Sequence, residues 1–412
     1  MDHRLRDIFR VAAGKHLSAV DADLSRSHQH EIGGLVKVGF GDVLGRPGKE
    51  EAFRFACKMV YITDEMEEPL IEDDHVTWYD SRRKSPYRSP EYRLYYHDNT
   101  VTELIQEGDF FLIAQQTNGT FMMCFTPADT DVEAQLRNLF GLTDQLEEKF
   151  QSSNISDKKL SLPIQLLLEQ LGIIIELKSD EDSDLLAYLL NLYPNGLPKS
   201  YEFSALARKR KPAEPLKNPD EALLIWLKEE EIMFRTYENY LVRKRLLEGF
   251  GSDGGDVDAF INFSLSVQNR RKSRVGFAFE NHLEYLFELF SLSFEKGSSK
   301  NTTENRSKPD FLFPSFKAYH DKNYPDDKLF LLGAKTTCKD RWRQVLAEGD
   351  RLKRKYLVTI QPGISIAQLS EMRSKKLQLV VPVSLRENYP ISEQEHIMTI
   401  NDFIVEVGYN KH

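Results

Sequence analysis

The chain has 412 residues and a formal net charge of −9, and 41% of its residues are hydrophobic. This length suits two domains better than one, and the composition is typical of a folded globular protein rather than a disordered or fibrous one. No apolar run approaches the ~20 residues that a membrane helix needs, so no membrane partner is expected. Three cysteines, a sparse and odd number, argue against a disulfide framework and a zinc site, and favour a reducing compartment, by default the cytoplasm.

The first 180 residues are expected to form a mainly β domain. Short runs rich in aromatic and β-branched residues alternate with turn residues, as in a small barrel or sandwich. The expected strands cover residues 35–40, 53–62, 76–79, 93–96, 110–115 and 120–125, and the expected helices cover 131–140 and 163–171. Acidic residues gather between 64 and 74 whereas the run 82–93 is basic, so an acidic whole chain still leaves room for a DNA-binding surface.

Residues 181–218 are expected to link two domains, because they contain four prolines and a basic run; a short helix near 203–210 is the alternative. Residues 219–412 are expected to form an α/β catalytic domain, because apolar strands alternate with amphipathic helices. The expected helices cover 220–247, 279–290 and 341–355, and the expected strands cover 311–313, 329–334, 356–360 and 377–381.

Asp310 and Lys335 form the first part of a candidate active site. Hydrolysis of a phosphodiester needs a divalent cation held by carboxylates, and a nearby lysine adds positive charge beside the phosphate. An aspartate that opens one strand and a lysine that ends the next can meet at one end of a sheet. The nuclease pattern PD…(D/E)xK fits both residues, but Gly333 stands where its second carboxylate is expected.

Glu348 is the candidate for the missing carboxylate. In a helix over 341–355, a period of 3.6 residues places Arg341 and Glu348 on one face and Trp342 and Val345 on the face toward the core. Each site residue also has a plainer interpretation, as a Pro-Asp turn, a solvated lysine or a surface glutamate. The residues alone therefore leave a nuclease and a purely structural set as open alternatives.

Several motifs occur together in the order typical of one family of DNA-cutting enzymes. They are NRRKSRVG (269–276), KPDFLFP (308–314), AYHD (318–321), KTTCKDRWRQ (335–344) and LVVPVS (379–384). By these motifs the chain resembles the EcoRII-type restriction endonucleases over roughly residues 219–390. The resemblance implies a type II, Mg²⁺-dependent nuclease of the PD-(D/E)xK superfamily, with a permuted active site in a mixed sheet flanked by helices.

The resemblance implies roles for four side chains. Asp310 and Glu348 match the metal-binding carboxylates, Lys335 matches the catalytic lysine, and Glu280 matches a further glutamate on a helix. The tyrosine and histidine of the AYHD motif lie near the site by the same analogy, with no role that follows from the residues themselves.

The resemblance also implies which side chains read DNA bases. Lys339, Asp340 and Arg341 match the base-reading positions, and they suit a CC…GG site because Lys and Arg donate to guanine and Asp accepts from cytosine. The plainer interpretation is the start of a helix with a favourable early acid.

The central base pair of such a site stays open. The positions that hold flipped bases in the family match Leu227 and Glu231, which depart from the family's arginine and aromatic residue. Trp226 beside them could stack on a flipped base or belong to the core.

Basic residues supply further candidate contacts, with a solvated surface as the alternative in each case. Contacts to DNA phosphates are expected from Arg270, Arg271, Lys272 and Arg274. More weakly, the N-terminal half resembles the family's B3-like pseudobarrel, which binds a second copy of the target as effector. Its candidate DNA contacts are Arg82, Lys84, Arg88, Arg93 and His30.

The implied partners are double-stranded DNA, a second copy of the chain in a homodimer, and a protective DNA methyltransferase. The alternative functions are a sequence-specific DNA-binding regulator with an inactive nuclease-like domain and, third, a DNA-repair nuclease.

Overall fold

The computed structural model describes residues 4–22, 30–85, 87–142, 149–153, 155, 160–173, 175, 182–251, 254–339 and 341–409. The chain divides into two compact units. The N-terminal unit comprises residues 2–175 and 362–369, and the C-terminal unit comprises residues 176–361 and 370–412. The domain boundaries expected from the sequence remain predictions.

The N-terminal unit is built on one sheet with the strand order β2-β5-β4-β3-β7-β6-β1-β8. The strands are β1 (Phe9–His16), β2 (Glu31–Ile32), β3 (Ala52–Tyr61), β4 (Leu70–Asp80), β5 (Tyr92–Tyr95), β6 (Phe110–Gln116), β7 (Phe121–Thr126) and β8 (Gln151–Ser152). Among the described strands, β3 and β7 are parallel and every other neighbouring pair is antiparallel. Successive strand residues alternate between two buried apolar clusters, so both faces of the sheet are covered.

The helices of this unit are α1 (Leu5–Ile8), α2 (Ala19–Ala22), η1 (Leu35–Val38), α4 (Phe40–Leu44), η2 (Thr102–Leu104), α5 (Asp131–Phe140) and α6 (Leu162–Gln170). The mainly β architecture is as expected, but the strand predicted over 35–40 is wrong. Gly34 and Gly39 have φ values of 89° and 90°, and these left-handed turns bound η1 and start α4 instead. The likeness to a B3-like pseudobarrel stays a prediction.

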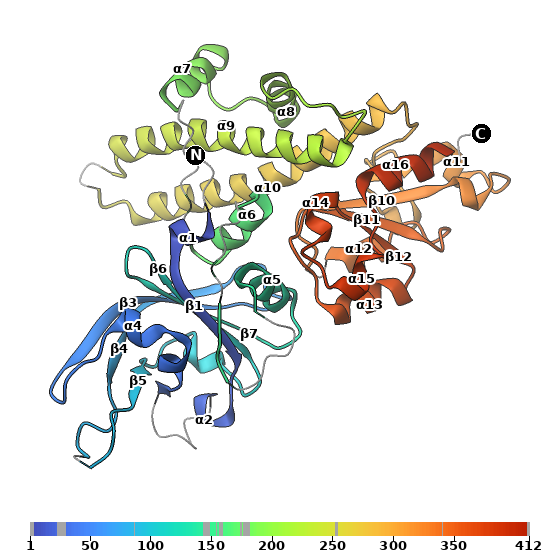
Figure 1. Ribbon diagram of the computed structural model, residues 1–412. Coiled ribbons are helices and arrows are strands. Elements are labelled where there is room, and N and C mark those ends of the chain that lie inside the picture. The colour runs from blue at the N-terminus through green and yellow to red at the C-terminus, as the bar shows by residue number, and fades with distance from the viewer. Residues whose placement is uncertain are drawn as a thin grey trace. The chain divides into compact units, whose positions relative to one another are not determined.

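The C-terminal unit begins with helices. They are α7 (Asp182–Leu192), α8 (Ser200–Arg210), α9 (Pro219–Glu248) and α10 (Val257–Leu289). In Figure 1 the two long helices α9 and α10 lie side by side, and α8 contacts both. The segment expected as a linker therefore contains two packed helices, whose buried residues share a core with α9 through Leu189, Phe203 and Tyr237.

A four-stranded mixed sheet with the order β12-β11-β10-β9 follows these helices. β9 (Phe311–Phe313) is antiparallel to β10 (Phe330–Lys335), whereas β10, β11 (Lys355–Thr359) and β12 (Leu377–Val380) are parallel. The accompanying helices are η3 (Glu304–Arg306), α11 (Phe316–His320), η4 (Asp326–Lys328), α12 (Arg341–Leu346), α13 (Ile366–Ser374), α14 (Val383–Arg386), α15 (Ile391–Gln394) and α16 (Ile400–Tyr409). The expected α/β core with a mixed sheet and helices is confirmed.

The helix predicted over 341–355 is much shorter than expected. α12 ends at Leu346, and Gly349 adopts a left-handed φ of 64°. A Cβ atom at Gly349 would lie 2.6 Å from Leu331 Cδ1, so the chain makes a tight turn there against β10.

Among the described residues, no helix is both long and apolar enough to cross a membrane. Cys57, Cys124 and Cys338 are buried free thiols.

Asp220 joins α9 to the C-terminal helices. Its Oδ1 accepts backbone N–H groups of Val383 and Ile400, and its Oδ2 accepts that of Asn401, all at 3.0 Å. The side chain is buried, and burial raises the pKa of its carboxyl. One carboxylate thus satisfies donors at the start of α14 and α16 that their own helices cannot pair.

Removing this carboxylate is expected to destabilise the C-terminal unit. Asp220→Ala should lower the free energy of unfolding by about 3 kcal/mol, because charged hydrogen bonds are lost and buried N–H groups lose their acceptor. Urea denaturation followed by tryptophan fluorescence measures this change. The exposed neighbour Glu221 provides the control, since Glu221→Ala should change stability by less than about 0.5 kcal/mol. Equal stability of both variants would contradict the proposed role of Asp220.

Candidate active site

Asp310 and Lys335 meet at one end of the mixed sheet. The antiparallel register pairs Phe311 with Leu332, which brings Asp310 beside Gly333. Asp310 Oδ2 accepts the backbone N–H of Ala334 at 2.7 Å and the Lys335 ammonium at 2.7 Å. Both side chains are less than one-fifth exposed, so this ion pair is partly shielded from water.

Glu348 lies in the turn after α12 rather than on the helix. Its Oε2 is buried and has no hydrogen-bond partner among the described residues. Burial, reinforced by the negative charge of Asp310, raises the pKa of the Glu348 carboxyl to about 7, against the opposing charges of Lys335 and Lys355. The structure therefore brings Glu348 into the electrostatic neighbourhood of Asp310 and Lys335.

Gly333 explains why the second carboxylate cannot come from β10. A Cβ atom at this position would lie 2.4 Å from Val345 Cγ2, where α12 packs on the strand. Val345 and Trp342 are both fully buried, which agrees with the helical phase expected for the first turns of α12. Packing of α12 thus excludes a side chain at the usual acidic position.

Glu280, on α10, is the fourth predicted site residue. Burial and then the charge of Asp310 raise the pKa of its carboxyl, whereas Lys296 and Lys335 lower it. The Lys296 ammonium lies 3.3 Å from Glu280 Oε2. Glu280 therefore shares the electrostatic environment of Asp310, and Lys296 is a site residue that sequence reasoning missed.

The donor set suits a hard divalent cation. In the described parts of the chain, no three His, Cys, Asp or Glu side chains lie close enough together to enclose a metal ion by themselves. Mg²⁺ commonly keeps several waters and binds through one or two carboxylates together with phosphate oxygens. The unpartnered Oε2 of Glu348 and the nearby carboxylate of Asp310 fit that requirement.

The AYHD motif lies on and after α11. The Tyr319 hydroxyl donates to Glu304 Oε2 at 2.6 Å, and the same oxygen accepts the N–H of Asp350 at 3.1 Å. Burial and this hydrogen bond raise the pKa of Tyr319. The buried Lys355 donates to the Leu346 carbonyl, at the start of the turn that carries Glu348. These contacts hold the 346–351 turn in place.

Two of the candidate base-reading residues are described: Lys339 lies between β10 and α12, and Arg341 is the first residue of α12. Arg341 is exposed, and its N–H donates to the Cys338 carbonyl at 2.7 Å. Lys339 has a left-handed φ of 32°. Asp340 lies outside the described residues. The buried Cys338 is anchored by its N–H to Gln361 Oε1, which fixes the start of this segment.

The basic cluster on α10 is divided between surface and interior. Lys272 is exposed, whereas Arg271 pairs with the fully buried Glu238 at 2.6 Å and Arg270 is half-buried. Arg274 is only 9% exposed, and its guanidinium lies over the rings of two buried phenylalanines. The expectation of a phosphate contact at Arg274 is therefore corrected, because this arginine is part of the interior between α8 and α9.

The positions matched to base flipping are also buried. Trp226 is 2% exposed, donates its N–H to the Lys211 carbonyl, and packs against His282 and Tyr285. Leu227 is 2% exposed as well. Glu231 is 5% exposed and pairs with Arg235 one helical turn later. Trp226 is thus a core residue.

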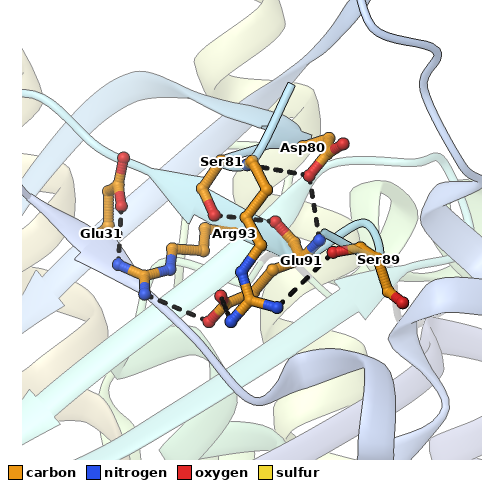
Figure 2. Close-up of polar contacts among 7 residues, drawn as sticks. Glu31, Asp80, Ser81, Ser89, Glu91 and Arg93 are labelled. Atoms are coloured by element: carbon orange, nitrogen blue, oxygen red, sulfur yellow. Dashed lines mark hydrogen bonds and ion pairs between the residues drawn. The ribbon is translucent and has the colours of Figure 1, made fainter. Parts of the chain in front are cut away.

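The N-terminal candidates surround a network of carboxylates. Figure 2 shows Arg93 between Glu31 and Glu91, with Nη1 at 2.9 Å from Glu31 Oε2 and Nη2 at 3.1 Å from Glu91 Oε1. Arg82 pairs with the other oxygen of Glu91 at 2.6 Å. Asp80 Oδ1 accepts the N–H groups of Arg82 and Glu91, which closes the base of the loop.

The remaining N-terminal candidates differ in exposure. Lys84 and Arg88 are exposed on the loop between β4 and β5. His30 Nε2 lies 2.8 Å from Asp98 Oδ1, and its ring packs edge-on against Tyr95 and Tyr96. Among the described residues of this loop, Arg83, Lys84 and Arg88 are exposed, whereas Arg82 and Arg93 pair with carboxylates.

Part of the chain is similar in sequence to known proteins. Residues 234–404 match the protein-family model described as EcoRII C terminal. The chain is 45% identical to the type II restriction enzyme EcoRII of Escherichia coli over 190 residues, which are 46% of this chain and 46% of that protein. The match thus spans about half the length of the curated relative.

Two solved structures are similar to part of this chain. Metal-depleted Ecl18kI in complex with uncleaved, modified DNA has a TM-score of 0.43 at 17% identity, covering 56% of this chain and 84% of that one. The complex of restriction endonuclease PspGI with substrate DNA has a TM-score of 0.42 at 17% identity, covering 58% of this chain and 99% of that one.

Proposed function

We propose that residues 234–404 form an EcoRII C-terminal family domain and that the chain is a type II restriction endonuclease. It would make Mg²⁺-dependent double-strand cuts in DNA. The observation that carries the proposal is the contact between Asp310 and Lys335, with the buried, unpartnered oxygen of Glu348 in the same electrostatic neighbourhood. The match spans only about half of the relative's length. The activity of the whole chain is therefore inferred from this site and is not taken over from the relative.

Each site residue has a chemical role in this proposal. Asp310 and Glu348 would hold Mg²⁺, which when bound neutralises phosphate charge and makes a bound water more acidic. Lys335 would leave Asp310 for the scissile phosphate, where its charge stabilises the negative charge that develops during hydrolysis. Glu280 would add a carboxylate at the edge of the site.

The recognition of DNA is proposed from side-chain chemistry. Lys339, Asp340 and Arg341 would read a near-palindromic CC…GG site, because arginine and lysine donate to guanine and aspartate accepts from cytosine. A homodimer would cut both strands, since its two-fold symmetry mirrors that of the site. Lys272 and Arg270 would contact phosphates.

The N-terminal unit is proposed to bind a second copy of the site as effector. Lys84 and Arg88 would contact its backbone, with Arg82, Arg93 and His30 beside them. A cognate DNA methyltransferase would protect the host's own sites.

The test is digestion of a sequenced plasmid by the full chain with Mg²⁺, followed by mapping of the ends. A single recurrent sequence at the termini supports restriction, and EDTA should stop the reaction. Ends that follow DNA damage would indicate a repair nuclease instead. Sequence-specific binding without any metal-dependent product would favour the regulator with an inactive nuclease-like domain.

The pH dependence of cation use follows from Glu348. Because the pKa of its carboxyl is raised to about 7, it carries a proton below that pH, and this proton competes with the cation. The Mg²⁺ concentration for half-maximal cleavage is expected to be about tenfold higher at pH 6 than at pH 8. It should change little between pH 8 and pH 9. Equal half-maximal concentrations at pH 6 and pH 8 would contradict this prediction.

A further inference from the structure

Lys296 is held beside the candidate active site by its backbone. Glu295 and Leu312 exchange two hydrogen bonds of 2.9 Å, and the N–H of Gly297 donates to the Pro309 carbonyl at 2.9 Å. Residues 295–297 therefore run antiparallel to the strand that Asp310 opens. Lys296 lies between these two anchored neighbours, so its Cα position is fixed relative to Asp310.

Gly297 shows how close this approach is. A Cβ atom at Gly297 would lie 2.6 Å from the Cα of Lys308 and 2.7 Å from the Pro309 carbonyl oxygen. Only glycine fits against the backbone of the Lys-Pro-Asp motif without a shift. The segment that carries Lys296 is thus built tightly against the residues that position Asp310.

The Lys296 side chain is directed at two carboxylates of α10. Its ammonium lies 3.3 Å from Glu280 Oε2 and 3.3 Å from Glu284 Oε2, which are one helical turn apart. The same ammonium nitrogen lies over the ring of Phe311, 5.4 Å from the ring centroid. The Lys296 side chain is only 32% exposed, and packing and charge together hold its ammonium beside Glu280.

We propose that Lys296 is a positioning residue that serves as a built-in cation for Glu280, so that the site takes one divalent cation, at Asp310 and Glu348. This inference rests on the proposed function. A second divalent ion on Glu280 would have to bind within a few ångströms of the ammonium, where like charges repel strongly in a partly buried site. Lys296 therefore keeps Glu280 and Glu284 in place without a metal ion.

The test counts bound cations and needs no catalysis. Mn²⁺ alone is titrated into the full chain without DNA, and free Mn²⁺ is measured by electron paramagnetic resonance. The wild-type chain is expected to bind one ion that Asp310→Ala removes. Lys296→Met should gain one further ion per chain, Lys296→Arg should match the wild type, and Lys296→Met combined with Glu280→Gln should return to one. Lys300→Ala is the control, because Lys300 is an exposed lysine of the same segment.

Two results would overturn the inference. One is an unchanged count in Lys296→Met, and the other is a second ion in the wild type that Glu280→Gln removes. Failure of the proposed function would look different, since the wild-type chain would then cut no DNA with Mg²⁺. The number of ions gained by Lys296→Met would still report whether the lysine keeps a cation away from Glu280.

Discussion

Asp310→Ala is expected to reduce DNA cleavage by at least about a thousandfold while DNA binding is retained. The Asp310 carboxylate accepts hydrogen bonds from the Lys335 ammonium and from the backbone N–H of Ala334 in β10. Its loss therefore removes a proposed cation ligand and the group that positions the lysine. Several kcal/mol of charge stabilisation depend on the cation, and each 1.36 kcal/mol is a factor of ten in rate. Single-turnover cleavage and gel-shift binding in Ca²⁺ measure the two effects separately.

Asp327→Ala is the matched control, because Asp327 is an exposed aspartate of the same unit. It should cleave at the wild-type rate. Cleavage by Asp310→Ala within tenfold of the wild type would remove Asp310 from the active site, and loss of DNA binding together with cleavage would indicate a folding defect instead.

Gly333→Glu is expected to destabilise the C-terminal unit by about 3 kcal/mol and not to replace Glu348. This substitution restores the usual (D/E)xK spacing, yet its Cβ would lie 2.4 Å from Val345 Cγ2 in a fully buried contact. Chemical denaturation measures the loss of stability, and cleavage by Gly333→Glu combined with Glu348→Gln tests the replacement. That double variant should be inactive.

The steric cause can be separated from the added charge. Gly333→Glu combined with Val345→Ala should recover part of the lost stability, because the clash is relieved. Gly276→Ala is the control for replacing a glycine, since nothing lies within 4 Å of a Cβ there and the helix α10 accepts alanine. Wild-type stability of Gly333→Glu alone would refute the packing argument.

The sequence predicted the C-terminal sheet well because its strands are buried on both faces. Each of the four strands is a short apolar run, and each predicted range overlaps the observed strand to within two residues. Strand ends also predicted that Asp310 and Lys335 would meet. The prediction failed where a single glycine decides the path, as at Gly39 and Gly349, because left-handed turns interrupt patterns that otherwise continue.

The positions of three residues in the C-terminal unit could not be predicted from local sequence patterns. Glu348 was selected partly by the phase of a helix that ends before it, so the helical argument does not account for its position and the family resemblance carried that inference. Lys296 was missed because it reaches Glu280 through tertiary pairing of residues 295–297 with 309–312, which no local pattern reveals. Arg274 was expected at the surface because a run of basic residues does not show which member turns inward.

The contact between Gly333 and Val345 also restricts how this site could change over generations. An acidic residue arriving first at position 333 would meet a filled core, and a smaller residue arriving first at position 345 would leave a cavity beneath α12. Either single step is expected to lower the stability of the C-terminal unit before the second can compensate. Packing of α12 therefore disfavours an acidic residue at position 333. A return to the usual (D/E)xK spacing would need two substitutions, at positions 333 and 345.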